Sequence, residues 1–451
     1  MEKRDFLKYA GAGAIAIGAF AATGCRIKKN TVAVPEPSDG IPCRTNPVNG
    51  DKTSLLGFGC MRWPMVKGED GKDHIDQEAV NEMVDYALEH GINYYDTSPA
   101  YLQGQSEMAA GIALSRHPRD SYFIATKLSN FSDSSFEASK KMYLDSFRDL
   151  RTDYIDYYLL HSIGRSGNRS YQARYVDNGI LPFLLEEKAA GRIRNLGFSF
   201  HGPQDQFDYF MELFDKGEVR WDFVQIEMNY VDWNHADGRR NVNASYFYAQ
   251  LEKRGIPIMV MEPLLGGRLA KVPANISRAL HEREPEKSVA SWAFRFVGSF
   301  PGVQTILSGM TSMDPLIENV ETFGKFIPLS EDEIALMEKL ATEMKEYPLV
   351  NCTDCKYCMP CPYGIDIPGV FKHYNTSITE GTYVQSRDQK NYRKIRNRYL
   401  TSYNKAVPSV RQADHCIACG TCLPHCPQSI AIPGELRRIA RYIEKLKQET
   451  L

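Results

Sequence analysis

Residues 76–96 read DQEAVNEMVDYALEHGINYYD and combine an amphipathic helix, a glycine and a short apolar strand. Apolar residues recur at helical spacing over 77–89, and Asp76 stands where an N-terminal cap is expected. Gly91 can end this helix in a left-handed conformation, and aromatic and β-branched residues follow it over 92–96. A helix that leads into a buried strand is the repeating unit of a parallel sheet.

The same unit recurs between residues 54 and 330. Short apolar runs predict eight strands, at 55–60, 92–96, 122–127, 155–161, 193–199, 223–228, 256–262 and 303–308. Helical periodicity separates them at 77–89, 106–114, 136–150, 181–190, 205–214, 243–254 and 288–300. Eight such units over about 275 residues predict a closed (β/α)₈ barrel. An open doubly wound sheet is the alternative, but no Gly-x-Gly-x-x-Gly follows a predicted strand.

Polar residues stand at the carboxyl ends of the predicted strands, the edge at which barrel active sites lie. Asp96, Lys127 and His161 end the second, third and fourth strands, and Tyr101 follows shortly after the second. A nearby ammonium lowers the pKa of a tyrosine, and a carboxylate keeps a buried lysine charged. The four residues therefore predict a site in which Tyr101 protonates a carbonyl oxygen that His161 orients. Each of them alone also fits a structural role in a turn, a loop or the core.

Eight of the eleven cysteines lie beyond residue 350, in two groups with two- and three-residue gaps. Such spacing is typical of ferredoxins that carry two [4Fe–4S] clusters, in which the last cysteine of each group ligates the other cluster. Cluster one is then predicted on Cys352, Cys355, Cys358 and Cys426. Cluster two is predicted on Cys416, Cys419, Cys422 and Cys361. Two four-cysteine zinc sites are the alternative.

Four segments of the barrel region carry a family resemblance: GINYYDTSPAY at 91–101, ATK at 125–127, LLH at 159–161 and KAAGRIRNLGFS at 188–199. Together they resemble the signature elements of the aldo-keto reductases. The resemblance implies a (β/α)₈ TIM barrel, a nicotinamide cofactor across its mouth, and a catalytic tetrad of Asp96, Tyr101, Lys127 and His161. The cysteine-rich tail resembles the small, mainly helical ferredoxin-like iron–sulfur domain found on one bacterial branch of that family.

The resemblance also implies cofactor contacts. Ser199 and Gln225 match residues that hold the nicotinamide carboxamide, and the pyrophosphate channel is matched by Pro263, Leu264 and Gly266. The adenosine side is matched by Ser308, Gly309, Met310, Glu318 and Asn319. Members that prefer NADPH usually carry a cation there for the 2′-phosphate. Residues 308–319 contain no Lys or Arg, so NADH and NADPH both remain candidates.

The amino terminus predicts export. Over residues 1–25, a basic start precedes a Gly/Ala-rich core and a small-residue ending, as in secretory signals. Residues 3–8 (KRDFLK) resemble a twin-arginine signal, and residues 22–25 resemble a lipoprotein box that would place a lipid anchor on Cys25. A periplasmic protein is predicted, with a cytoplasmic protein as the alternative; the apolar stretch 10–25 is too short for a membrane span. Prolines indicate a linker over 26–50.

The domain order is therefore signal (1–25), linker (26–50), barrel (51–330), and C-terminal helices with the iron–sulfur domain (331–451). A net charge of −2 argues against nucleic-acid binding. The basic run 390–399 suits either a docking site for an acidic redox partner or a solvated helix face.

The predicted function is the nicotinamide-dependent interconversion of a small-molecule carbonyl and an alcohol. The polar loop 163–179, with Arg165, Arg169, Tyr171, Arg174 and Tyr175, is expected to wall the pocket and to favour a sugar-like or acidic carbonyl. Nicotinamide transfers a two-electron hydride, whereas a [4Fe–4S] cluster transfers single electrons, and no flavin motif is present. The clusters are therefore structural or serve electron transfer, and a catalytically silent, electron-transfer or binding barrel is the alternative.

Overall fold

The structure is a computed structural model, and it describes residues 40–164, 171–236 and 242–451. The predicted export signal, Cys25, Arg165 and Arg169 lie outside the described residues, so export and lipidation stay predictions of the sequence. Along the described ranges, no helix combines the length and the apolar character that a membrane crossing needs.

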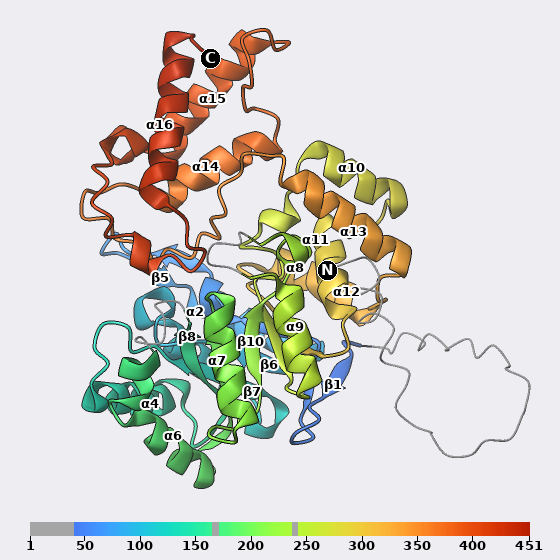
Figure 1. Cartoon of the computed structure of the whole chain (residues 1–451), viewed down its shortest axis with the longest axis vertical. Helices are drawn as coiled ribbons and strands as arrows, with labels where there is room; N and C mark the ends of the chain where they lie inside the picture. The colour runs from blue at the N-terminus through green and yellow to red at the C-terminus, as the bar shows by residue number, and fades with distance from the viewer. Residues whose placement is uncertain (1–39, 165–170, 237–241) are drawn as a thin grey trace, which may run out of the picture.

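Eight parallel strands close into a barrel in the order β10-β11-β12-β3-β6-β7-β8-β9 (Figure 1). In chain order they are β3 (Leu56–Gly59), β6 (Tyr94–Asp96), β7 (Phe123–Leu128), β8 (Ile155–Ile163), β9 (Ile193–Phe200), β10 (Val224–Glu227), β11 (Ile258–Met261) and β12 (Val303–Ser308). Every predicted strand is present, which confirms the (β/α)₈ fold. The barrel interior is packed with a layer of side chains from these strands and their ends: Tyr94, Ala125, Tyr157, Leu159, Phe223, Met259 and Leu307.

A ring of helices covers the barrel: α2 (Gln77–Glu89), α3 (Ser106–Leu114), α4 (Phe136–Leu150), α6 (Ile180–Ala189), α7 (Gln204–Asp215), α9 (Ala244–Lys253), α11 (Val289–Gly298) and α12 (Met313–Gly324). Asp76 and Ser288 cap α2 and α11, because their side chains accept hydrogen bonds from the backbone N–H of Ala79 and Ser291. The predicted helices omitted α12, the eighth member of the ring. The short α8 (Asp232–His235) and α10 (Ala274–Arg283) lie in the connections.

A hairpin of β1 (Cys43–Thr45) and β2 (Lys52–Ser54) precedes the first barrel strand and corrects part of the predicted linker 26–50. Arg44 donates a 2.7 Å hydrogen bond to the carbonyl of Phe300 and two more to the carbonyls of Gly298 and Val303. These carbonyls lie between the end of α11 and the start of β12, so the hairpin is part of the barrel floor. The prolines gave no sign of this, because the partners of Arg44 lie about 255 residues away in the sequence.

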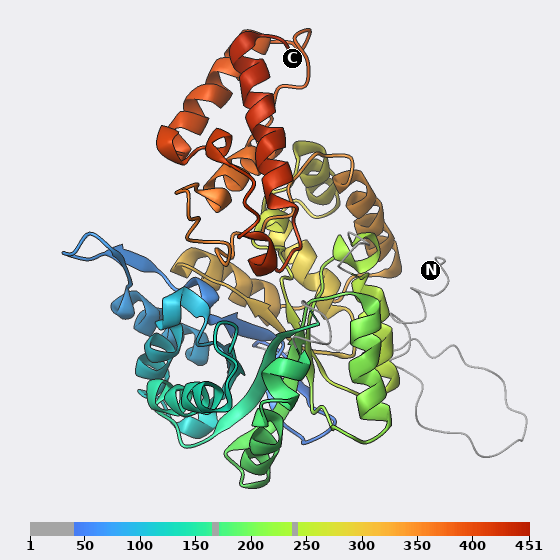
Figure 2. The ribbon, with the colours of Figure 1, turned by 60° about the vertical axis from the view of Figure 1, so that its left-hand side comes forward.

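The C-terminal helices stand over one end of the barrel (Figures 1 and 2). Helix α13 (Glu331–Met344) packs on the barrel, and its Ser330 and Glu333 form a capping box. Helices α14 (Ile367–Thr379), α15 (Tyr392–Ala406) and α16 (Ile432–Gln448) share a separate apolar core. The cysteine loops lie between these helices and the barrel mouth. A second hairpin, β4 (Met65–Lys67) with β5 (Asp73–Ile75), projects beside the mouth.

Candidate active site

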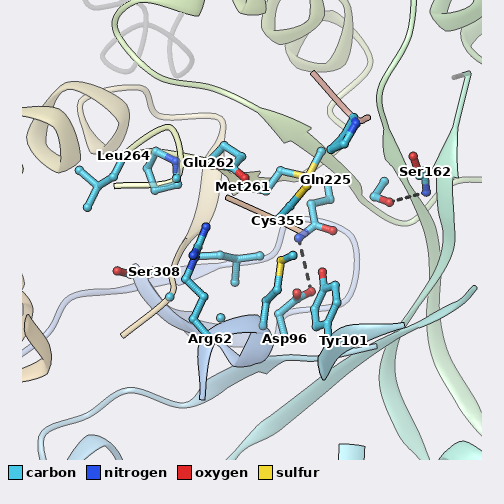
Figure 3. A pocket seen from close by; sticks show the side chains of 18 of the residues that line it. Arg62, Asp96, Tyr101, Ser162, Gln225, Met261, Glu262, Leu264, Ser308 and Cys355 are labelled. Carbon is cyan, nitrogen blue, oxygen red and sulfur yellow. Dashed lines mark hydrogen bonds between the residues drawn. The ribbon is translucent and has the colours of Figure 1, made fainter. Parts of the chain in front are cut away.

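A cavity of about 320 Å³ opens at the carboxyl ends of the barrel strands (Figure 3). Its wall includes the side chains that the sequence analysis assigned to the tetrad: Asp96, Tyr101, Lys127 and His161. They come from the ends of β6, β7 and β8 and from the turn after β6. The structure therefore brings the four predicted residues together at the mouth of the barrel.

Lys127 and Asp96 form a buried ion pair at the base of the cavity. Lys127 Nζ lies 2.6 Å from Asp96 Oδ1, and the two side chains are 1% and 4% exposed. Lys127 also donates a 2.9 Å hydrogen bond to the Thr97 carbonyl, and Gln225 Nε2 donates a 3.4 Å hydrogen bond to Asp96 Oδ2 (Figure 3). Because the partners satisfy each other, both charges can be retained inside the protein.

Tyr101 lies beside this ion pair. Its ring centroid is 4.9 Å from Lys127 Nζ, and the residue is 8% exposed. A tight turn presents it, since Leu102 and Gln103 both adopt positive φ angles of 48° and 58°. Non-glycine residues rarely occupy that region, and such strain is concentrated at functional sites.

The pKa of Tyr101 corrects one sequence prediction. Burial raises this pKa well above its usual value, and the carboxylate of Asp96 raises it further. The expected lowering by the Lys127 ammonium is wrong in direction, because Asp96 is paired with that ammonium and desolvation disfavours a phenolate. Burial also raises the pKa of Asp96, against the lowering effect of Lys127 and its hydrogen bonds. Tyr101 is thus held as a neutral phenol.

His161 is oriented by two serines that the sequence analysis missed. Its Nδ1 lies 2.6 Å from Ser129 Oγ and 3.3 Å from Ser98 Oγ. The ring nitrogen Nε2 is therefore on the side away from the serines, and the ring centroid lies 6.0 Å from that of Tyr101. Each serine stands two residues after a tetrad residue, Ser98 after Asp96 and Ser129 after Lys127, and this spacing was the available signal.

Several predicted cofactor contacts also line the cavity: Ser199 and Gln225 for the nicotinamide, Pro263, Leu264 and Gly266 for the pyrophosphate, and Ser308 and Gly309 for the adenosine side. Ser199 Oγ accepts a 2.8 Å hydrogen bond from the backbone N–H of Ser162 (Figure 3). Within the described residues, Gln225 Oε1 and Ser162 Oγ are buried without a hydrogen-bond partner. Buried polar atoms need partners, and a carboxamide offers both a donor and an acceptor. The residues present therefore fit a nicotinamide.

Three predicted adenosine contacts do not reach the cavity. Met310 is fully buried in the core, and Glu318 is exposed on α12. Asn319 lies behind the wall, where its side-chain amide donates a 3.0 Å hydrogen bond to Ser308 Oγ. The face that α12 presents to the barrel decides the positions of Glu318 and Asn319, and the packing of the segment before α12 decides that of Met310; the motif alone revealed neither.

The loop 163–179 does not wall the cavity as far as the structure describes it. Tyr171 and Tyr175 are buried, and Tyr171 packs edge-on against Phe210 of α7. Arg174 donates hydrogen bonds to Asn130 Oδ1 at 3.1 Å and to the His161 carbonyl at 2.9 Å. These contacts stabilise the backbone behind His161. The described part of this loop therefore gives no indication of a sugar-like or acidic substrate.

The two predicted sets of cluster ligands lie around two separate spaces. One, of about 190 Å³, is lined by Cys361, Cys416, Cys419 and Cys422 among others. A smaller one is lined by Cys352, Cys355, Cys358 and Cys426. Cys358 also borders the first space. Each space is therefore lined by cysteines of both sequence groups, and the assignment of four of them to each cluster stays a prediction.

The four thiols of each predicted set line a common space, which is the arrangement that the corners of a cubane require. Burial raises the pKa of Cys352 to about 11 and that of Cys355 to about 12, so a cluster bound there would have to displace a proton from each thiol.

Comparisons with known proteins agree with this architecture. Residues 55–342 match the model of the Aldo/keto reductase family, and residues 351–431 match the 4Fe-4S dicluster domain. L-galactose dehydrogenase of Arabidopsis thaliana is 25% identical over 307 residues, which cover 64% of this chain and 90% of that protein. Protein tas of Escherichia coli is 26% identical over 338 residues, covering 64% of this chain and 94% of that protein.

Two solved structures share the fold. An aldo-keto reductase from Bacillus halodurans in its holo form superimposes with a TM-score of 0.53 at 24% identity, covering 66% of this chain and 96% of that one. An aldo/keto reductase from Klebsiella pneumoniae in complex with NADP and acetate gives 0.52 at 21% identity, covering 67% and 96%. With the family match across the whole barrel, this protein belongs to the aldo/keto reductase family and carries a C-terminal 4Fe-4S dicluster domain.

Proposed function

We propose that the protein is a nicotinamide-dependent oxidoreductase that interconverts a carbonyl compound and an alcohol, with Tyr101 as the proton donor. The observation that carries this proposal is the buried Lys127–Asp96 pair, which lies next to Tyr101 and His161 in the wall of one cavity. A phenol and an imidazole on the same wall can both reach one carbonyl oxygen. Family membership agrees with this chemistry.

In the proposed reaction, the side chains position the oxygen and move one proton. When bound, reduced nicotinamide supplies a hydride to the carbonyl carbon. His161 and Tyr101 hold the carbonyl oxygen, and the Tyr101 hydroxyl passes its proton to that oxygen. Gln225, Ser162 and Ser199 hold the carboxamide and so fix which face of the ring meets the substrate. Since residues 308–319 carry no cation, we propose that both NADH and NADPH serve.

The test is a panel of carbonyls and alcohols assayed with both cofactors. Polyhydroxylated compounds belong in the panel because a relative of 25% identity is an L-galactose dehydrogenase. Turnover of at least one pair with either cofactor supports the proposal. If the protein bound neither cofactor, the result would instead support the alternative of a catalytically silent barrel that serves electron transfer or binding.

The two directions of the reaction are expected to depend differently on pH. Carbonyl reduction needs the protonated phenol, and the pKa of Tyr101 is raised well above its usual value. Its kcat/KM is therefore expected to be flat from about pH 6 to about pH 9. Alcohol oxidation needs the phenolate, so its kcat/KM is expected to rise about tenfold per pH unit over that range. Steady-state rates in both directions check this, and an oxidation rate that is independent of pH would contradict it.

We also propose that the cysteine sets hold two [4Fe–4S] clusters with crossed ligation. Cys426→Ser and Cys352→Ser are then expected to leave the same single cluster, with about four irons instead of about eight. Cys361→Ser and Cys416→Ser are expected to leave the other one. Iron analysis and electron paramagnetic resonance of the reduced variants measure this. If Cys361→Ser and Cys352→Ser instead gave the same spectrum, both cysteines would ligate the same cluster, and the ligation would be uncrossed.

A further inference from the structure

The cavity at the barrel mouth has one wall that does not come from the barrel. Cys355, Tyr357 and Pro427 line it together with Tyr101 and His161. Figure 3 shows Cys355 among the barrel side chains around Gln225 and Asp96. We name residues 351–358, which carry three of the proposed ligands of cluster one, the ligand loop. This loop and the proline after Cys426 therefore complete the site.

The barrel holds the ligand loop in place at several points. A Cβ on Gly266 would lie 2.4 Å from Thr353 Cα and 2.5 Å from its carbonyl oxygen, so only glycine allows this close packing. Arg62 donates a hydrogen bond to the same carbonyl. Arg268 donates a 3.1 Å hydrogen bond to Asn351 Oδ1.

The segment around Cys426, which supplies the fourth proposed ligand of cluster one, is anchored to the barrel as well. The side-chain amide of Gln428 lies 3.0 Å from each carboxylate oxygen of Glu227, at the end of β10. Gln428 follows Cys426 by two residues. Both halves of the proposed cluster-one site are thus fixed to the barrel, at the end of β10 and in the segments that follow β3 and β11, and the loop wall has a defined position relative to Tyr101.

Tyr357 is the polar side chain that this wall contributes. It lines the same cavity as Tyr101 and His161, so its phenol faces the space in which the carbonyl is proposed to bind. A second hydroxyl near the proton donor can hydrogen-bond a second oxygen of a substrate, whereas a simple aldehyde has no such oxygen.

We propose that the ligand loop is the substrate-binding wall of the barrel and that Tyr357 is a specificity-determining residue, which selects carbonyl compounds with a neighbouring hydroxyl group. This inference rests on the proposed function, since it assumes that the carbonyl binds at Tyr101. It links the two domains, because iron bound by the ligand loop orders the same residues that contact the substrate. Cluster one then supports catalysis by shaping the pocket, whether or not it exchanges electrons.

The first test compares DL-glyceraldehyde with propanal as substrates of the full chain with both clusters. For Tyr357→Phe, the KM for glyceraldehyde is expected to rise about tenfold, while its kcat and both constants for propanal stay within twofold. Tyr363→Phe is the matched control, because Tyr363 is 51% exposed and does not line the cavity. Equal effects of Tyr357→Phe on both substrates, or no effect on either, would overturn the specificity role.

The second test uses the unaltered protein and does not depend on turnover. Hydrogen–deuterium exchange is compared with and without NADP⁺ and DL-glyceraldehyde. Because NADP⁺ is the oxidised cofactor, it cannot reduce the aldehyde during the measurement. Slower exchange is expected in the ligand loop and in residues 96–105, with no change in residues 383–391. Protection of 96–105 alone would overturn the inference and leave the proposed function intact. Exchange unchanged in both segments would count against both.

Discussion

Replacing Tyr101 by Phe is expected to lower kcat for carbonyl reduction by about 10²- to 10⁴-fold, the usual contribution of a general acid. The ring fills the same space in the variant, so the cavity keeps its shape, but no proton reaches the oxygen from this position. Because the phenol lies beside Lys127 and not among the carboxamide contacts, the affinity for NADPH is expected to stay within about twofold.

The measurement compares the purified full chain and the Tyr101→Phe variant with NADH and with NADPH. Cofactor binding is followed by fluorescence, and iron content confirms that the clusters are intact. Tyr122→Phe is a suitable control, since Tyr122 is also a buried barrel tyrosine but lies outside the cavity. If Tyr101→Phe turned over as fast as the natural sequence, Tyr101 would not be the acid, and the barrel assignment would need another proton donor.

Replacing Lys127 by Met is expected to cost about 3–5 kcal/mol of stability, because it leaves the carboxylate of Asp96 buried without its partner. The two side chains are 1% and 4% exposed, so water cannot replace the lost ammonium. Denaturant unfolding of the barrel, followed by tryptophan fluorescence, measures the change; the tryptophans Trp63, Trp221, Trp233 and Trp292 are all buried in it.

Two further variants separate pairing from packing. The double change Lys127→Met with Asp96→Asn removes both charges and is expected to recover at least about half of the loss. Lys141→Met breaks the exposed ion pair with Asp145, in which Lys141 is 76% exposed, and is expected to cost less than about 1 kcal/mol. A loss in Lys127→Met that the double change does not reduce would mean that the lysine stem, and not the charge pair, carries the stability.

Much of the barrel could be predicted because its signals are local. Each strand is a short apolar run between turn residues, and caps such as Asp76 and Ser288 act on the next few residues of the chain. The tetrad could be predicted for a related reason: parallel strands end at one edge, so residues that end successive strands become neighbours. The hairpin at Arg44 could not be predicted, since its carbonyl partners belong to a distant loop.

The electrostatics of the site followed from burial, which no spacing of residues specifies. The sequence predicted a lowered pKa for Tyr101 from one nearby charge, whereas the folded site combines desolvation with the Asp96 carboxylate and raises that pKa. The serines that orient His161 and the burial of Met310 likewise depend on how the strands and α12 pack.

The amino-acid sequence by itself determined the (β/α)₈ barrel, the tetrad at its strand ends and the two cysteine groups, because periodicity and fixed spacing encode them locally. Only the tertiary structure decided that the ligand loop closes the barrel mouth. Thr353 and Gly266 are 87 positions apart (353 − 266), and their contact requires the C-terminal domain to pack on the strand ends. Such packing depends on the complementary shape of two surfaces, and no local stretch of sequence records that shape.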